Sequence, residues 1–178
     1  YLAVQFKEMG VPLIIALNMM DVAESRNIEI DHEALSSLLE VPVVPTVARS
    51  NRGIDDLLDK IVEVALEGRG WHPKLINYGT DIDQSLNEIE AVLEGARSIG
   101  EKYSPRWLAL KCLEKDGEIL GLLEPEKDIR QEVDAVCRKT DRHIMATLEE
   151  EPEGIIADHR YGYIAGITKN TVKRKIEF

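Results

Sequence analysis

Hydrophobic residues in the first third of the chain alternate between short continuous runs and helical spacing. Residues 11–17 (VPLIIAL) form a continuous apolar run that ends in a polar loop, which is typical of a buried parallel strand. Residues 41–45 (VPVVP) form a second run, whose prolines favour a strand at a sheet edge. Helical spacing follows each run, first behind an N-cap at Asp31 and then over residues 54–66. The pattern predicts a right-handed strand–helix–strand–helix unit of an α/β fold.

The pattern changes after residue 67, where Gly68 is a helix stop signal and residues 68–73 (GRGWHP) are typical of a linker. No convincing strand follows, and Pro152 with Gly154 is predicted to end one of the later helices. The later segments with helical spacing are 86–96, 105–113, a long one from about Pro125, and 155–172. We therefore predict an α/β plus all-α chain: a partial parallel sheet of the small-GTPase type, with about two strands and their helices, then a helical bundle over residues 80–172.

Composition narrows the classes of protein. The 178 residues include 33 acidic and 22 basic side chains, a net charge of −11, which disfavours a nucleic-acid partner. Cys112 and Cys137 form no CxxC pair, so a disulfide framework or a zinc site is disfavoured and a reducing, cytoplasmic setting fits better. The four histidines have no metal-ligand spacing, and no metal site is expected. No apolar run reaches the roughly 18 to 20 residues that span a bilayer.

The loop after the first predicted strand carries Asn18, Met19, Met20 and Asp21. Ligands of α/β folds bind at the carboxyl ends of parallel strands. A carboxylate there can accept both the ring N–H and the exocyclic NH₂ of guanine, while an Asn braces the loop and meets N7. Adenine offers neither donor in that arrangement. Asn and Asp after a strand are also common turn residues, so by itself the pattern leaves an ordinary turn open.

The loop after the second predicted strand, residues 46–53 (TVARSNRG), leads into a helix. Its small residues let backbone N–H groups approach a ring carbonyl closely. Asn51 and Gly53 also suit a plain strand-to-helix connection. Two consecutive strand ends with purine-compatible loops favour purine recognition over two unrelated turns.

The two loops carry a family resemblance. Residues 18–21 resemble the fourth guanine-specificity motif of small GTPases, and residues 46–48 resemble a variant of the fifth. More specifically, the chain is similar to the ferrous iron transport protein B family along its whole length, in four separated matches in the same order. These are residues 10–21 and 41–46 for the G domain, 105–111 for the helical domain, and 157–164 for the segment leading toward the membrane part.

The resemblance implies the cytoplasmic GTP-binding region of a prokaryotic iron(II) permease of the cell membrane, followed by a transmembrane pore. Its helical domain would stabilise the GDP-bound state. Asp21 would bind guanine N1 and N2, Asn18 would hold N7 and the loop, and the Ala48 N–H would meet O6. The residues implied at the nucleotide site are Asn18, Met19, Asp21, Thr46, Val47 and Ala48.

The resemblance also divides the chain into domains. Residues 1–70 would be the C-terminal half of a G domain, residues 71–172 the helical regulatory domain, and residues 173–178 a basic juxtamembrane tail. Residues 151–178 carry a net charge of +1 in an otherwise acidic chain, which fits a tail on the cytoplasmic face of a membrane. Basic residues at a solvated helix end would give the same local charge.

The chain departs from the family pattern in what it lacks. Met19 stands where GTPases usually have Lys, and neither GxxxxGKS, GxxxxGKT, a Mg²⁺-binding Thr switch nor DxxG can be placed. We expect a piece of a longer protein without the first half of its G domain. It would have no catalytic residues and would not hydrolyse GTP, and Mg²⁺ would bind with GTP or GDP only in the intact protein.

This expectation has structural consequences. A strand over residues 11–17 would keep an unpaired edge, and two strands with two helices make a poor core. Residues 1–67 are therefore expected to be partly disordered or to pack against another copy. The missing half of the G domain and a downstream transmembrane domain would be the natural partners. The alternative is a non-catalytic helical module that binds a partner, with the α/β segment only a relic.

Overall fold

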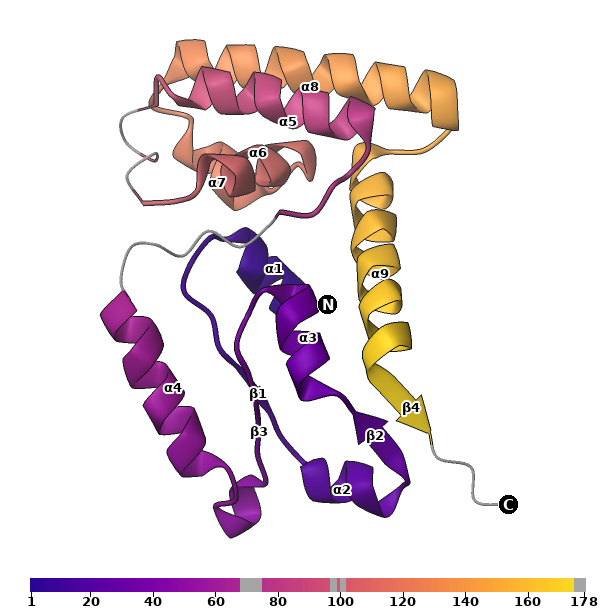
Figure 1. Ribbon diagram of the computed structural model, residues 1–178. Coiled ribbons are helices and arrows are strands. Elements are labelled where there is room, and N and C mark those ends of the chain that lie inside the picture. Colours follow the sequence, from indigo (N-terminus) through magenta and orange to yellow (C-terminus); the bar gives the residue numbers. More distant parts are fainter. Residues whose placement is uncertain (68–74, 97–98, 100–101, 175–178) are drawn as a thin grey trace. The chain divides into compact units, whose positions relative to one another are not determined.

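The computed structural model describes residues 1–67, 75–96, 99 and 102–174 (Figure 1). These residues form two compact units, which we call the α/β unit and the helical unit. The α/β unit comprises Tyr1–Lys74 together with Gly162–Phe178, and the helical unit comprises Leu75–Tyr161. The predicted linker and its stop signal at residue 68 lie outside the described residues. A mixed α/β chain with a small parallel sheet and a mostly helical remainder confirms the predicted fold class.

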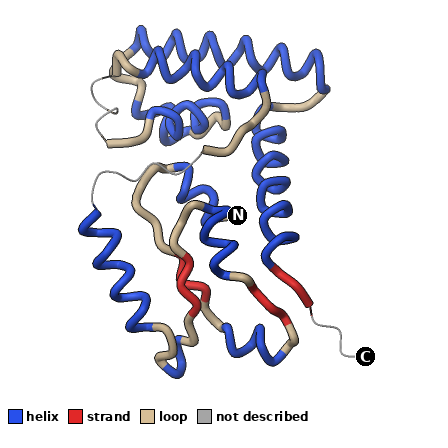
Figure 2. Tube along the Cα trace, in the orientation of Figure 1, coloured by secondary structure: helices blue, strands red, loops and turns tan. Residues whose placement is uncertain are grey.

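Short helices and three-residue strands alternate in the α/β unit (Figure 2). Its elements up to residue 67 are α1 (Leu2–Glu8), β1 (Ile15–Leu17), α2 (Met20–Ser25), β2 (Ile28–Ile30), α3 (His32–Leu39), β3 (Val43–Pro45), a 3₁₀ turn at Ala48–Ser50, and α4 (Ile54–Glu67). The predicted N-cap is confirmed, because the Asp31 carboxylate accepts a hydrogen bond of 2.9 Å from the Ala34 N–H.

Strands β1 and β3 form a parallel pair in which Ile15 lies opposite Val43 and Leu17 opposite Pro45. β3 lies at an edge of this two-stranded sheet, as the prolines of residues 41–45 predict. The prediction of one long buried strand over residues 11–17 is wrong in extent, since only residues 15–17 enter the ladder. Ala16 is exposed and its two neighbours are half-buried. A strand with a ladder partner on one side only is covered less than a central strand.

A second ladder was not expected from the sequence. β2 pairs antiparallel with β4 (Val172–Arg174), with Glu29 opposite Lys173. The prediction that no strand follows the linker is therefore wrong. All three β4 residues are exposed, so this strand has no hydrophobic alternation to reveal it. Lys173 and Arg174 of the predicted basic tail lie in β4, whereas residues 175–178 lie outside the described residues.

The core of the α/β unit brings the end of α9 (Pro152–Thr171) onto α3 and β3. Ile167 packs in one cluster with Leu39, Val41 and Val43. Tyr163 adds polar contacts, since its hydroxyl donates to the Leu38 carbonyl at 3.2 Å and accepts from the ammonium of buried Lys7 at 3.1 Å. The α/β unit is thus built from both ends of the chain.

Helix α4 leaves much of its apolar surface uncovered. Leu58, Ile61, Val62 and Leu66 are all large apolar residues with 46% to 80% of their surface exposed. Exposed apolar patches of this kind mark interaction surfaces or association hazards. Partial disorder of residues 1–67, or their packing against another copy, stays a prediction.

The helical unit has an apolar core of its own. Its elements are α5 (Thr80–Leu93), α6 (Pro105–Leu113), α7 (Gly117–Leu122), α8 (Lys127–Leu148) and the first part of α9. The fully buried side chains include Leu86 and Ile89 of α5, Leu108 of α6, and Val133 and Ile144 of α8. Figure 1 shows α5 and α8 side by side, and these two helices make the most extensive contact in the unit.

Two helix boundaries differ from the sequence expectation. Pro152 begins α9 rather than ending α8, because a proline in the first helical position has no N–H whose hydrogen bond could be lost. Helix α8 instead ends at Leu148 and is followed by a C-cap at Glu149, whose φ of 57° is left-handed. Helix α7, unforeseen in the sequence, is capped by the Asp116 carboxylate, which accepts from the N–H groups of Glu118 and Ile119 at 3.1 and 3.2 Å. None of the described helices combines the length and hydropathy needed to cross a bilayer.

Candidate functional site

The two predicted loops meet at the carboxyl ends of β1 and β3. Because these strands are parallel and in register, the residues that follow them leave the sheet at the same edge. The Thr46 N–H donates to the Leu17 carbonyl at 2.9 Å, and the Met20 N–H donates to the Thr46 carbonyl at 3.3 Å. Local strand pairing thus places the first loop directly against the second.

Asn18 joins the two loops through its side chain. Its Oδ1 accepts a hydrogen bond of 3.1 Å from the Ala48 N–H and a longer one of 3.5 Å from the Thr46 hydroxyl. Thr46 is buried, whereas Asn18 and Ala48 are exposed. Both bonds use only the Oδ1 of Asn18, so its NH₂ group can act as a donor toward a ligand.

A hollow of about 160 Å³ lies between the loops. Its lining contains all the predicted site residues except Thr46, which is buried, and adds two others. The lining residues are Asn18, Met19, Asp21, Val22, Val47, Ala48 and Arg49. Met19 has a left-handed backbone (φ 65°) at the N-cap of α2 and 59% of its surface exposed, so its side chain is available as an apolar wall.

Two arginines that the sequence reading did not single out pair with acids of α2. Arg49 forms an ion pair with Asp21, and Arg52 binds both carboxylate oxygens of Glu24, at 2.6 and 3.3 Å. The hydrogen bonds with Glu24 are the main cause that raises the pKa of Arg52, and the charge of Asp21 adds to it. The sequence feature that could have indicated these ion pairs is the presence of two arginines, three residues apart, in the first 70 residues, where acidic side chains outnumber basic ones.

Gly53 is the residue that lets the second loop close. Its φ is +77°, and a Cβ built on it would lie 2.2 Å from the Pro45 carbonyl oxygen. Just before it, the Val47 N–H donates to the Arg52 carbonyl at 2.9 Å. Any side chain at Gly53 would therefore push the loop away from β3.

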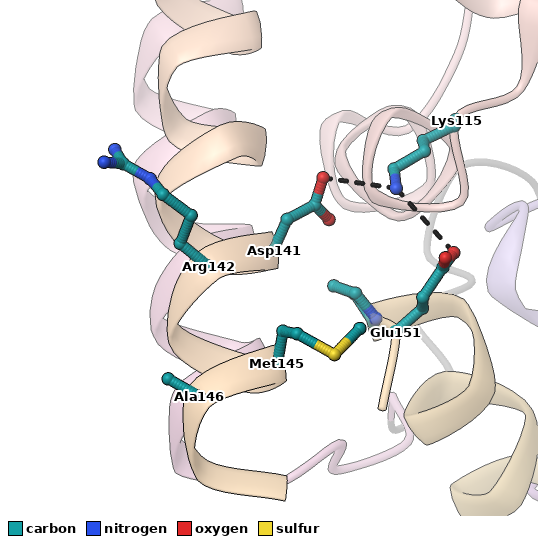
Figure 3. A pocket seen from close by; sticks show the side chains of 7 residues that line it. Lys115, Asp141, Arg142, Met145, Ala146 and Glu151 are labelled. Atoms are coloured by element: carbon teal, nitrogen blue, oxygen red, sulfur yellow. Dashed lines mark ion pairs between the residues drawn. The ribbon is translucent and has the colours of Figure 1, made fainter. Parts of the chain in front are cut away.

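A larger hollow of about 450 Å³ lies in the helical unit (Figure 3). The Lys115 ammonium points between Asp141 and Glu151, at 3.2 and 3.8 Å, and Met145 lies below them. Arg142 points away from this pair in Figure 3. Because its central charges satisfy one another, the arrangement serves to tie the turn after α6 to α8 and α9.

Neither cysteines nor acidic clusters form a second reactive centre in the described part of the chain. Burial raises the pKa of Cys112 to about 12 and that of Cys137 to about 11, which keeps both thiols protonated. No three His, Cys, Asp or Glu side chains converge as metal ligands among residues 1–67, 75–96, 99 and 102–174. His72 lies outside these residues.

Two family models match the chain. One described as "FeoB cytosolic helical domain" matches residues 78–173, and one described as "Ferrous iron transport protein B" matches residues 1–61. A Porphyromonas gingivalis "Fe(2+) transport protein A/Fe(2+) transporter FeoB fusion protein" is 36% identical over 97% of this chain and 21% of its own length. The Escherichia coli "Fe(2+) transporter FeoB" is 34% identical over 94% of this chain and 20% of its own length. The chain thus spans about a fifth of the length of these relatives.

Solved structures agree with these sequence matches. A GDP-bound mutant of NFeoB from S. thermophilus has a TM-score of 0.82 at 28% identity, with 97% of this chain and 63% of that chain covered. The mGMPPNP-bound NFeoB from S. thermophilus has a TM-score of 0.81 at 28% identity, with coverage of 100% and 64%. The two loops, the fold and both matches agree in order along the chain, so the chain belongs to the ferrous iron transport protein B (FeoB) family and matches its G-domain region and its cytosolic helical domain.

Proposed function

We propose that this chain supplies the guanine-recognition loops and the helical regulatory domain of the cytosolic part of a prokaryotic ferrous iron transporter. In this proposal GDP or GTP is the ligand, and the helical domain stabilises the GDP-bound state. A transmembrane domain that follows in the parent protein carries the iron(II). The proposal extends to this chain what the names of its relatives say of them, an Fe²⁺ transporter and an NFeoB bound to GDP or mGMPPNP.

The observation that carries the proposal is the contact of Asn18 with the Ala48 N–H at 3.1 Å. This bond holds both loops around the hollow of about 160 Å³, into which the Asp21 carboxylate also faces as a lining group. Asp21 has 22% of its side chain exposed, which leaves it half-shielded from water but reachable. A pre-organised acceptor in such a hollow recognises a ligand at a low ordering cost.

The base that fits this site best is guanine. The Asp21 carboxylate accepts from guanine N1–H and N2–H, and the Asn18 NH₂ group donates to N7. The Ala48 N–H, which donates to Asn18 Oδ1 in this structure, would turn to O6 when the base binds. Adenine carries no hydrogen at N1 and so offers the Asp21 carboxylate no donor there. A site built for donors rejects such an analogue strongly. Met19 stands where GTPases usually have Lys, and its side chain offers the base an apolar contact without a charge.

In this proposal, the chain does not carry the residues that perform phosphate transfer. Its 178 residues contain neither GxxxxGKS nor GxxxxGKT, the loop that cradles phosphates. We therefore propose that the chain alone does not hydrolyse GTP and that Mg²⁺ binds with the nucleotide only in the intact protein. We also propose that residues 1–70, 71–172 and 173–178 correspond to the G domain, the helical domain and a juxtamembrane tail, although residues 162–174 pack in the α/β unit.

Amide NMR of the 178-residue chain tests the base assignment, because it detects weak binding residue by residue. Guanosine is expected to shift the amide signals of Asn18, Asp21 and Ala48, whereas adenosine at the same concentration is not. Asp21→Ala should remove the guanosine response, and the matched control Asp31→Ala, which removes a carboxylate that caps α3, should retain it.

Equal shifts with adenosine, or an unchanged response in Asp21→Ala, would remove the guanine assignment. The alternative, a non-catalytic helical module that binds a partner protein, would then be the better account. The separate apolar core of the helical unit supports that alternative.

A further inference from the structure

Arg49 occupies the acceptor that the proposed site offers to guanine. Its guanidinium forms an ion pair with Oδ2 of Asp21 and belongs to the lining of the same hollow. Arg49 follows Ala48 in the second loop, so it reaches across the hollow from the side opposite α2. In the unliganded chain, the recognition carboxylate therefore already has a partner.

The partner resembles the ligand chemically. A guanidinium is a planar carbon that carries three nitrogens with N–H donors, and it suits carboxylate oxygens. The N1–C2–N2 edge of guanine is the same fragment built into a ring, with two N–H donors that point the same way. Both groups therefore compete for Oδ2 of Asp21.

We infer that Arg49 is an internal competitor of the guanine base: its side chain caps Asp21 in the empty site and must leave before the base can bind. The inference rests on the proposed function, because it takes guanine as the ligand. It identifies Arg49 as a residue that weakens base affinity and favours release.

Arg49 can leave because little holds it. Its side chain is 80% exposed, so its guanidinium is hydrated and its pair with Asp21 is of the weak surface kind. Arg52, three residues on, is different, because both oxygens of Glu24 bind it. The second loop thus carries one displaceable arginine and one anchored arginine.

The test uses guanosine, which is uncharged, so the phosphate attraction of an arginine cannot obscure the result. We expect Arg49→Ala to tighten guanosine binding by about two- to five-fold, the range of an exposed ion pair. Arg26→Ala is the matched control, because it removes the same charge from the exposed far end of α2. It should leave the affinity unchanged.

Salt provides a second readout. Screening weakens the Arg49–Asp21 pair, so the guanosine affinity of the unmodified chain should rise with ionic strength. That of Arg49→Ala should not. Equal or weaker binding by Arg49→Ala, or a rise that persists in this variant, would overturn the inference while leaving guanine recognition intact.

The ion pair is also measurable without any ligand. The ¹⁵Nε signal of Arg49 should report a less mobile side chain in the unmodified chain than in Asp21→Asn. Equal mobility would refute the capping contact whatever the guanosine result. A clear difference in mobility, combined with no guanosine binding to either the unmodified chain or Arg49→Ala, would refute the proposed function and the competition together.

Discussion

Arg160 is the charge whose removal should affect the helical unit most. Its side chain is 3% exposed, forms an ion pair with Glu114, and lies with its guanidinium carbon 5.9 Å from the centre of the Tyr78 ring. Glu114 is itself only 12% exposed and has a second cation, Lys111, at 3.0 Å. Arg160→Met keeps the length and apolar volume of the side chain but removes its charge.

The expected loss of stability depends on the Glu114 carboxylate, which stays largely buried after Arg160 is replaced. Removal of one partner of a buried ion pair typically costs about 3 to 5 kcal/mol, because the other charge is left uncompensated. Here Lys111 still faces the Glu114 carboxylate, so the lower end applies. We expect Arg160→Met to lower the free energy of unfolding of the helical unit by about 3 kcal/mol.

Urea unfolding followed by circular dichroism at the helix band measures this loss. Arg138→Met is the matched control, because Arg138 lies exposed on α8. Its change should stay within about 0.5 kcal/mol. The double variant Arg160→Met/Glu114→Leu should recover much of the stability, because it leaves no buried charge without a partner.

Two results would refute this reasoning. A loss below about 1 kcal/mol in Arg160→Met would mean that the pair behaves like a surface ion pair. A double variant as unstable as the two single changes added together would mean that packing, and not the uncompensated charge, sets the cost.

Three further predictions concern the cap of α7, the second loop and the thiols. Burial of Asp116 opposes its ionisation, but hydrogen bonds from the Ile119 amide and the Lys111 ammonium outweigh it and lower the pKa of this carboxyl. Its contribution to stability is therefore complete above the unfolded pKa of about 3.9 and is lost as the pH falls through the lower folded value. Asp116→Ala should cost about 1 kcal/mol at pH 7 in urea unfolding, and Asp116→Asn should keep the cap but flatten the acid dependence. Gly53→Ala should displace the second loop and abolish guanosine-induced shifts in amide NMR, whereas Gly121→Ala, where an added Cβ meets nothing within 4 Å, should leave them intact. Cys112 and Cys137 should resist a thiol reagent at pH 8 in the folded chain and react fully in urea, because burial raises the pKa of both thiols; fast reaction in the folded state would contradict this.

Local spacing was sufficient for the parts of the fold that depend on neighbours in the chain. The Asp31 cap involves a residue three positions away, and the apolar runs at residues 15–17 and 43–45 lie within the predicted strands. Asn18 and Asp21 could be named as candidates because their loop follows an apolar strand. Hydrophobic periodicity likewise revealed α8 and α9, although it misjudged the role of Pro152 between them.

The pairing of β2 with β4 could not be predicted in this way. Each strand has three residues, too few for an alternating pattern, and Ile28 lies opposite Arg174 at the other end of the chain. Helix α7 is six residues long and similarly carries too little periodicity.

The sequence by itself determined the order of the elements, the two purine-compatible loops and the family to which the chain belongs. Those features depend on spacing along the chain, where periodicity and motif order are visible. Only the tertiary structure decided that Asn18 bonds to Ala48, that Arg49 covers Asp21, and that Arg160 lies buried against Glu114. Charges and amides can pair with any partner that folding brings within a few ångströms, so their partners are set by the packing of distant segments and not by sequence separation.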